Sequence, residues 1–222
     1  MSGLLHLGPV PVRPDPGLWQ DLRDVPSSVL ADVTRDVRAA GHPLAMVAPR
    51  PGFIGPAVTV AAGSLAQWKA LDSVQPGDVL VIACDGRRDC AEFGAVFAAI
   101  AQARGAAAII TDGLLRDRAE IAALNIPVLA AGSHPASPFD PSPGRVNLPV
   151  TLLGLTVRPG DLVAGDGDGI AIILVESLGK LADRLPAQKA KEAALQKAID
   201  DGQMPEALVA GLARIPVQPP LM

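Results

Sequence analysis

Arg116 and Asp117 are the residues whose types and position best suit chemistry. They follow a short apolar segment, residues 107–111, whose length and flanking glycine predict a strand buried on both faces. A turn at Asp112 and Gly113 is expected to end this strand, because glycine adopts positive φ at little cost. A guanidinium beside a carboxylate at the carboxyl end of a parallel strand can form a site. Arg116 could bind a substrate carboxylate, and Asp117 could hold a hard divalent cation.

The same pair also has a structural explanation. Asp117 and Glu120 form the D-x-x-E pattern of a capping box, and Ile121 and Leu124 follow at helical spacing. Helix caps are much commoner than metal ligands, and Arg116 could be an ordinary solvated charge. The spacing alone favours a helix start, and both interpretations stay open at this point.

Other reactive side chains form no recognisable site. Cys84 and Cys90 match no zinc or CxxC pattern, so a reduced cytosolic setting is the simpler interpretation, with a disulfide as the alternative. The three histidines are scattered in regions rich in Pro or Gly: His6, His42 and His134. Residues 166–169 are similar to a calcium loop but lack its later ligands, so we expect a hairpin turn there. No phosphate-binding loop, dinucleotide fingerprint or Schiff-base lysine is indicated.

Alternating strands and helices must position the Arg–Asp pair. Residues 79–83 predict a strong strand, and residues 91–104 predict a helix with Gly105 just beyond its end. Strand, helix and strand in this order predict a βαβ unit with parallel strands and a right-handed crossover. A further strand is expected over residues 126–130, with Pro127 near its start.

The N-terminal part is expected to be mixed. An irregular arm over residues 1–16 precedes a helix with Ser27 or Ser28 as its N-cap and Gly41 just past its end. The next predicted elements are a loop over residues 48–55, a strand over 57–61 and a helix over 65–71.

The C-terminal part changes to hairpins and then helices. Short strands are expected over residues 146–155, 161–164 and 170–175, joined by Pro-Gly and Asp-Gly turns that favour antiparallel pairing. Two helical segments follow over residues 178–185 and 187–199, and Gly202 ends the second.

The composition indicates one globular domain. Of the 222 residues, 49% are hydrophobic and 19% are charged, which suits one sizeable core. A net charge of −4 and an aromatic content of 3% argue against nucleic acid as a partner. Prolines interrupt the first residues where a signal peptide needs an apolar core, and no apolar run approaches the ~20 residues that span a bilayer. We therefore expect a soluble, cytoplasmic protein that binds neither nucleic acid nor membranes.

The order of the motifs is more specific than any single motif. The series comprises Gly55-Pro56-Ala57-Val58-Thr59-Val60, Pro76-Gly77-Asp78, Gly94, Asp112-Gly113-x-x-Arg116-Asp117, Val146-Asn147-x-Pro149-Val150, Pro159-Gly160-Asp161 and Asp166-x-Asp168-Gly169. This series resembles the RraA-like family, which includes the 4-hydroxy-4-methyl-2-oxoglutarate aldolases and the regulators of ribonuclease E. The resemblance covers roughly residues 28–175.

The resemblance implies an α/β fold of the swivelling β/β/α type. One domain over residues 1–222 is expected, with a parallel βαβ part, an antiparallel hairpin part and flanking helices. Residues 1–16 would be the arm and residues 178–222 a C-terminal helical extension. Relatives usually assemble as a trimer or a pair of trimers, so a homotrimer or hexamer with sites at subunit boundaries is expected.

For the aldolase members, the resemblance implies class II chemistry with Mg²⁺ or Mn²⁺ and no organic cofactor. Asp117 matches the direct metal ligand, which can suffice because Mg²⁺ keeps several waters. Arg116 matches the residue that contacts the pyruvyl group and stabilises the enolate. The positions matched to substrate binding, where a helix N-terminus suits an anion, are Gly94, Ala95, Val96 and Phe97.

One position departs from the aldolase pattern. The glycine matched by Gly94 is typically followed by an acid that serves proton transfer, and here that residue is Ala95. Glu92 is the nearest carboxylate that could compensate, although its side chain starts from a different point and direction. Asp85 at a strand end and Glu192 from a neighbouring subunit are further candidates, and a solvated helix face is the alternative for Glu192.

Two hypotheses follow. The retained Arg116 and Asp117 favour a metal-dependent lyase acting on a small 2-oxo acid, either by aldol cleavage to pyruvate or by decarboxylation of oxaloacetate. Ala95 favours a non-catalytic regulator that binds a protein partner, although the regulators tend to lose the Asp of the pair. A related activity on a different small acid is a third alternative. We expect the enzyme.

Overall fold

The computed structural model describes residues 4–41, 44–48, 52–61, 63–138, 142–205, 209, 210 and 214. Its strands are β1 (His6–Leu7), β2 (Val37–Ala40), β3 (Ala45–Ala48), β4 (Phe53–Ala61), β5 (Val79–Ala83), β6 (Ala91–Phe93), β7 (Ala108–Leu115), β8 (Val128–Ser133), β9 (Arg145–Val146), β10 (Val150–Leu152), β11 (Leu155–Val157), β12 (Leu162–Gly165) and β13 (Ile170–Ile173). Its α-helices are α1 (Ser27–Val33), α2 (Ser64–Ala70), α3 (Ala95–Ala103), α4 (Arg118–Ala122) and α5 (Leu178–Asp200). Within the described ranges, no helix is long and apolar enough to cross a bilayer.

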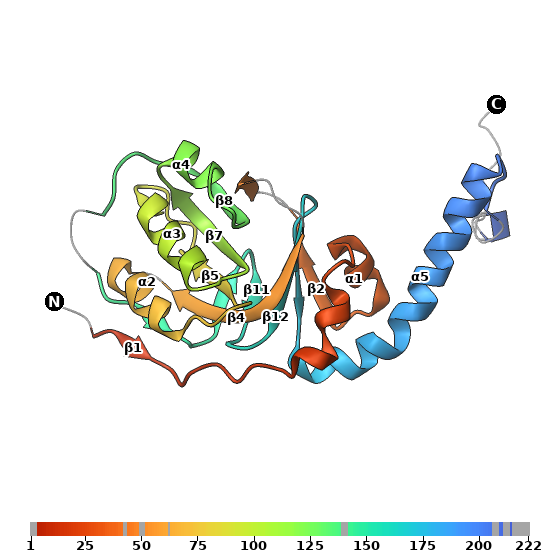
Figure 1. Cartoon of the computed structure of the whole chain (residues 1–222), viewed down its shortest axis with the longest axis horizontal. Helices are drawn as coiled ribbons and strands as arrows, with labels where there is room; N and C mark the ends of the chain where they lie inside the picture. Colours follow the sequence, from red (N-terminus) through yellow and green to blue (C-terminus); the bar gives the residue numbers. More distant parts are fainter. Residues whose placement is uncertain are drawn as a thin grey trace, which may run out of the picture.

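The strands form a mixed sheet in the order β2-β13-β12-β4-β5-β7-β8-β3 (Figure 1). Helices α2, α3 and α4 cover one face of the parallel part, and the β10–β11 hairpin packs on the opposite face. Helices α1 and α5 pack on the part formed by β2, β13 and β12. The predicted α/β fold, with a parallel part, an antiparallel hairpin part and a C-terminal helix, is confirmed.

The parallel core follows directly from the apolar runs. β5, α3 and β7 form the predicted βαβ unit, with β5 and β7 parallel and in direct register. Every residue of β5 is buried, because helices cover one face of the sheet and the hairpin covers the other. Phe97 on α3 is also fully buried, a contribution of about 1.5–3 kcal/mol for such a side chain. Gly105 has a φ of 83° directly after α3, as its predicted place beyond the helix requires.

β4 joins the parallel and antiparallel parts of the sheet. Its first residues, from Phe53 to Pro56, pair antiparallel with β12, and its last residues, from Ala57 to Ala61, pair parallel with β5. The predicted loop over residues 48–55 is therefore wrong at its end, while residues 49–51 lie outside the described ranges. Gly55 sits where a Cβ would overlap the carbonyl oxygen of Gly77, so only glycine permits this close approach.

Two predicted helices are shorter than expected, because strand pairing takes over part of each. α1 ends at Val33, and Val37–Ala40 pairs with β13 instead of continuing the helix to Gly41. α3 begins at Ala95, and Ala91–Phe93 pairs with the end of β7. In both cases a neighbouring strand edge satisfies backbone groups that the local helical pattern would have paired internally.

The turn expected at Asp112 and Gly113 is wrong. Both residues lie inside β7, which runs on to Leu115. Position 113 requires glycine because two side chains pack against its backbone. A Cβ there would lie 2.6 Å from Cys84 Sγ and 2.7 Å from Glu92 Cγ. β7 therefore delivers Arg116 and Asp117 directly from its carboxyl end.

The C-terminal part confirms the predicted hairpin at residues 166–169 and corrects the other hairpin and the helices. The strand expected over residues 146–155 is broken by a turn between β10 and β11, and β12 pairs with β4 and β13 instead of pairing across Pro159-Gly160. β10 pairs antiparallel with β11, and β12 pairs antiparallel with β13 across the predicted turn at residues 166–169. The two predicted helical segments are one helix, α5, which contains Pro186. Strong helix formers on both sides of Pro186 continue the helix despite the lost hydrogen bond. The second half of α5 extends away from the body (Figure 1).

Candidate active site at the carboxyl end of β7

Asp117 is the N-cap residue of α4, but its side chain caps a different helix, α3. Its backbone lies in the left-handed region, with φ 59° and ψ 46°, and its side chain makes no hydrogen bond to α4. Instead, Asp117 Oδ2 accepts a hydrogen bond of 3.0 Å from the backbone N–H of Ala95, the first residue of α3. The predicted helix start is confirmed, because α4 begins at Arg118 with Asp117 at its N-cap position, but the side-chain bond of a capping box is absent. The carboxylate lies at the positive end of α3.

Gly94 makes this contact possible. A Cβ at Gly94 would overlap Asp117 Oδ2 and would lie 3.0 Å from Arg116 Cγ and 3.1 Å from Arg116 Nε. Its φ of −136° is one that any residue adopts, so the requirement for glycine is one of space. The motif glycine thus lets the Arg–Asp pair lie against the start of α3.

The Asp117 carboxylate fits a divalent cation. Oδ2 is held by the Ala95 amide and lies 3.7 Å from Arg116 Nε, whereas Oδ1 has no hydrogen-bond partner among the described residues. A ligating carboxylate oriented by a hydrogen bond on its other oxygen is typical of metal sites. Within the described ranges, no group of three or more His, Cys, Asp or Glu side chains converges on one point. The donors therefore suit an ion such as Mg²⁺ that keeps waters and takes substrate oxygens.

A hollow of about 160 Å³ lies between the Arg–Asp pair, α2 and α3. It is lined by the sequence-predicted residues Glu92, Gly94, Val96, Phe97, Arg116 and Asp117. The structure thus brings together six of the seven positions that the sequence indicates, and the seventh, Ala95, contributes the amide that holds Asp117. The first-turn amides of Val96 and Phe97 lie where a helix leaves N–H groups unpaired, which suits an anion.

Residues from α2 and from the segment after β8 also line the hollow: Ser64, Gln67, Trp68, Ser137 and Pro138. Sequence reasoning missed all of them. The sequence pattern could have indicated Gln67, because it is a polar amide among the buried residues of a short helix, with Ala66 and Ala70. The Trp68 ring packs edge-on against Phe97, with ring centroids 5.6 Å apart, and forms an aromatic wall.

Glu92 is a buried carboxylic acid side chain with two side-chain partners. Its Oε2 accepts a hydrogen bond of 2.9 Å from Gln67 Nε2, and its Oε1 accepts one of 2.9 Å from Arg87 Nε. Arg87 Nη2 also lies 2.7 Å from Oε1, in an ion pair where the Glu92 side chain is 1% exposed. Donors on both oxygens therefore hold the Glu92 carboxylate in a fixed orientation.

The neighbouring thiol is not a nucleophile. Cys84 and Cys90 are both free and buried in this structure. Burial strongly raises the pKa of the Cys84 thiol, and the nearby Glu92 carboxylate adds to this effect. A thiol held in its protonated form beneath the site is a packing group.

The two other candidate carboxylates lie away from the hollow. Asp85 follows β5 in a left-handed conformation, with φ 51°, and does not line the hollow. Glu192 lies on the half of α5 that projects away from α3 (Figure 1), where its Oε1 accepts a hydrogen bond from Gln188. Within one chain, Glu92 is thus the carboxylate besides Asp117 that lines the described hollow.

Solved structures share this fold. Streptomyces coelicolor RraAS2, described as an unusual member of the RNase ES inhibitor RraA protein family, gives a TM-score of 0.72 at 25% identity, covering 86% of this chain and 98% of that chain. An uncharacterized protein from Pseudomonas syringae pv. tomato gives a TM-score of 0.77 at 24% identity, covering 88% of this chain and 98% of that chain.

Sequence comparison agrees. A provisionally named 4-hydroxy-4-methyl-2-oxoglutarate aldolase from Halalkalibacterium halodurans is 30% identical over 187 residues, which cover 82% of this chain and 88% of the relative. The family profile described as RraA-like, Aldolase/RraA, matches residues 27–172. The chain therefore belongs to the RraA-like family.

Proposed function

We propose that this protein is a divalent-metal-dependent carbon–carbon lyase. It cleaves a 4-hydroxy-2-oxo acid such as 4-hydroxy-4-methyl-2-oxoglutarate to pyruvate, and it also decarboxylates oxaloacetate. The observation that carries this proposal is the Asp117 carboxylate, with Oδ2 held by the Ala95 amide and Oδ1 left for a metal beside Arg116. The provisional names of relatives at about 30% identity support the same activity.

Each residue of the site has a role that follows from its position. The first-turn amides of Val96 and Phe97 and the Arg116 guanidinium bind and orient the carboxylate and oxo group of the substrate. Bound at Asp117, Mg²⁺ or Mn²⁺ would supply Lewis-acid polarisation of the 2-oxo group. Arg116 stabilises the negative charge that develops on the oxo oxygen as the carbon–carbon bond breaks.

Glu92 acts as the proton acceptor, because Ala95 has no side chain that can take up a proton. The Glu92 side chain accepts the proton of the 4-hydroxyl group, through one water, as the bond between C3 and C4 breaks. The products are one keto acid and the enolate of pyruvate, and the same proton then returns to the enolate carbon. Decarboxylation of oxaloacetate releases CO₂ to give the same enolate and has no hydroxyl proton to remove.

The regulator hypothesis is the competing proposal. Ala95 in place of an acid favours it, and so does the structural likeness to RraAS2. A regulator of this kind would have no requirement for Asp117 Oδ1 to be available. We further propose that the protein acts as a homotrimer or hexamer, which the mass measured by light scattering would test.

Pyruvate release by the purified protein tests the lyase. The substrates are 4-hydroxy-4-methyl-2-oxoglutarate and oxaloacetate, each with Mg²⁺, with Mn²⁺ and with EDTA. We expect turnover with metal, none with EDTA, and a loss of at least about 100-fold in Asp117→Asn. Asparagine tolerates the left-handed backbone and can still accept from the Ala95 amide, so this variant removes the charge and little else. Metal-independent rates, or an active Asp117→Asn, would contradict the lyase and leave the regulator hypothesis ahead.

A further inference from the structure

A second hollow lies on the outer side of the Arg–Asp pair. It has a volume of about 280 Å³ and is lined by Arg116, Asp117, Arg118, Ser133, His134 and Pro135. Arg116 and Asp117 border both hollows, so the pair stands between the inner one and the outer one. A substrate that reacts at Asp117 can therefore extend in either direction.

The outer hollow suits an anion. Its lining holds two guanidinium groups, one imidazole and one hydroxyl against the single carboxylate of Asp117. That carboxylate already accepts from the Ala95 amide and lies 3.7 Å from Arg116 Nε. Arg118, the first residue of α4, contributes a positive charge that has no role in the proposed lyase reaction.

The hydrogen bonds of His134 determine what its ring can do. The backbone N–H of Ala136 donates to His134 Nδ1 at 3.1 Å, so Nδ1 carries a lone pair and the neutral ring carries its proton on Nε2. The opposite tautomer would donate to Ala136 O, but that contact is longer, at 3.4 Å, and the oxygen already accepts from the Ala91 amide at 2.7 Å. His134 Nε2 is thus a hydrogen-bond donor, and binding a metal through it would require the tautomer that the Ala136 amide disfavours.

The position of His134 is fixed as well as its tautomer. Its backbone N–H donates to Leu115 O at 2.9 Å, which extends the pairing of β7 and β8 up to the Arg–Asp pair. Among the described residues, Nε2 has no hydrogen-bond partner. A fixed donor without a partner, beside two arginines, is an incomplete site for a carboxylate.

We propose that the outer hollow binds the carboxylate that lies beyond the scissile bond of a dicarboxylic 2-oxo acid. His134 Nε2–H and the Arg118 guanidinium donate to this carboxylate, and the pyruvyl half lies in the inner hollow. His134 and Arg118 thereby select dicarboxylic over monocarboxylic 2-oxo acids. This inference rests on the proposed lyase function for the placement of the pyruvyl half.

The test compares two substrates that differ in the distal carboxylate. They are 4-hydroxy-4-methyl-2-oxoglutarate and the monocarboxylic 4-hydroxy-2-oxopentanoate, and the readout is the ratio of their kcat/KM values. His134→Asn keeps an acceptor for the Ala136 amide but has no N–H at the Nε2 position, and we expect the ratio to fall about tenfold. His134→Gln places an amide N–H near the Nε2 position and should restore part of the ratio. Arg118→Ala should lower it similarly, and the remote exposed control Arg158→Ala should not.

The outcomes separate this inference from the proposed function. An unchanged ratio in both His134→Asn and Arg118→Ala, with turnover still dependent on Asp117, would overturn the outer subsite and keep the lyase. If no variant turns over either substrate, calorimetry with Mn²⁺ decides by comparing the binding of 2-oxoglutarate with that of 2-oxobutyrate. Tighter binding of the diacid that is lost in His134→Asn supports the subsite without the lyase. Equal binding of the two acids overturns the subsite.

Discussion

At the scale of single residues, Gly94 and Asp117 constrain each other across 23 positions of sequence. The carboxylate occupies the space where any other residue at position 94 would place its Cβ. The left-handed backbone of Asp117 aims its side chain back at α3, away from α4. Strain of this kind is typical of residues held in place for function.

Gly94→Ala should separate activity from stability. The new methyl group must displace Asp117 Oδ2 and the Arg116 side chain, and misplacement of a catalytic group by about 1 Å can cost on the order of 100-fold in rate. The backbone at position 94 suits alanine, so we expect only a small change in Tm. Gly167→Ala is the matched control, since a Cβ there meets nothing within 4 Å. Equal pyruvate release by Gly94→Ala and wild type would show that the Asp117 contact is not needed.

Glu92→Gln should affect the two reactions unequally. Aldol cleavage needs an acceptor for the hydroxyl proton, and decarboxylation of oxaloacetate does not, so we expect the first rate to fall about 100-fold and the second to fall much less. The variant also removes the buried charged partner of Arg87 and leaves the exposed Asp89, at 3.6 Å. This lowers stability, so a thermal melt must accompany the assay. Parallel losses in both reactions would assign Glu92 to structure rather than proton transfer.

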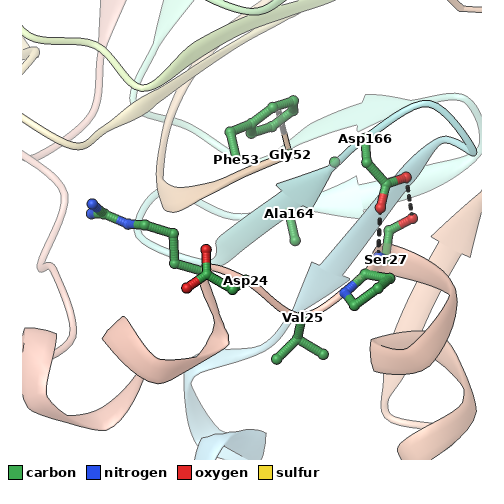
Figure 2. A pocket seen from close by; sticks show the side chains of 10 residues that line it. Asp24, Val25, Ser27, Gly52, Phe53, Ala164 and Asp166 are labelled. Carbon is green, nitrogen blue, oxygen red and sulfur yellow. Dashed lines mark hydrogen bonds between the residues drawn. The ribbon is translucent and has the colours of Figure 1, made fainter. Parts of the chain in front are cut away.

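At the scale of elements, Asp166 ties the turn between β12 and β13 to the start of α1. Figure 2 shows its carboxylate on Ser27, with Oδ2 accepting from the backbone amide and Oδ1 from the hydroxyl, each at 2.7 Å. Ser27 is therefore not the N-cap of α1, which is Pro26, but the first helical residue and a donor to a distant turn. The contact borders a hollow of about 290 Å³ that includes Asp24 and Phe53.

This contact predicts a pH dependence of stability. Burial by itself raises the pKa of Asp166, but the Ser27 amide and hydroxyl outweigh it, so the pKa lies below 3.8 in the folded state. The stability that the ionised group contributes is fully present above pH 3.8 and is lost as the pH falls through the folded pKa. Asp166→Asn should thus be less stable than wild type in urea at neutral pH, and the difference should close in acid. Asp168→Asn, an exposed control in the same turn, should show no such gap.

At the scale of the whole molecule, the N-terminal arm ties distant turns together. From β1, which pairs with β9, it runs along the lower edge of the molecule toward α1 (Figure 1). Arg13 forms a two-point ion pair with the buried Asp78, with Nε 2.8 Å from Oδ1 and Nη2 2.6 Å from Oδ2. The carbonyl oxygen of Val12 packs so closely on Gly160 that a Cβ there would overlap it.

Arg13→Ala should destabilise the protein far more than loss of a surface pair. Asp78 would remain as a buried charge without its partner, at a cost of about 3–5 kcal/mol. Lys69→Ala removes the exposed pair with Asp72, which solvent screens, and should change the stability much less. Urea denaturation of both variants checks this. Similar midpoints would mean that the arm contributes little to folding.

Local chemistry in the sequence determined the central layer and the identity of the main site residues. Strand β5 has the predicted bounds, because a parallel strand covered on both faces must be a continuous apolar run. Gly105 and Gly202 end α3 and α5 as predicted, because a left-handed residue past a helix end is a local requirement. The motif order indicates Arg116 and Asp117 as candidate site residues, and both line the hollow beside α3.

Only the tertiary structure decided how those residues are used. Asp117 and Glu120 fit a local capping pattern, yet the carboxylate caps α3, because β7 runs past Gly113 and brings Asp117 to that helix. The partners of Glu92 come from α2 and from the loop after β5, so no local spacing could name them. Strands β2 and β6 formed where helix was expected, because each pairs with a strand that folding brings alongside. Propensity and spacing act within a few residues, whereas hydrogen bonding and close packing act between any residues that the fold brings into contact.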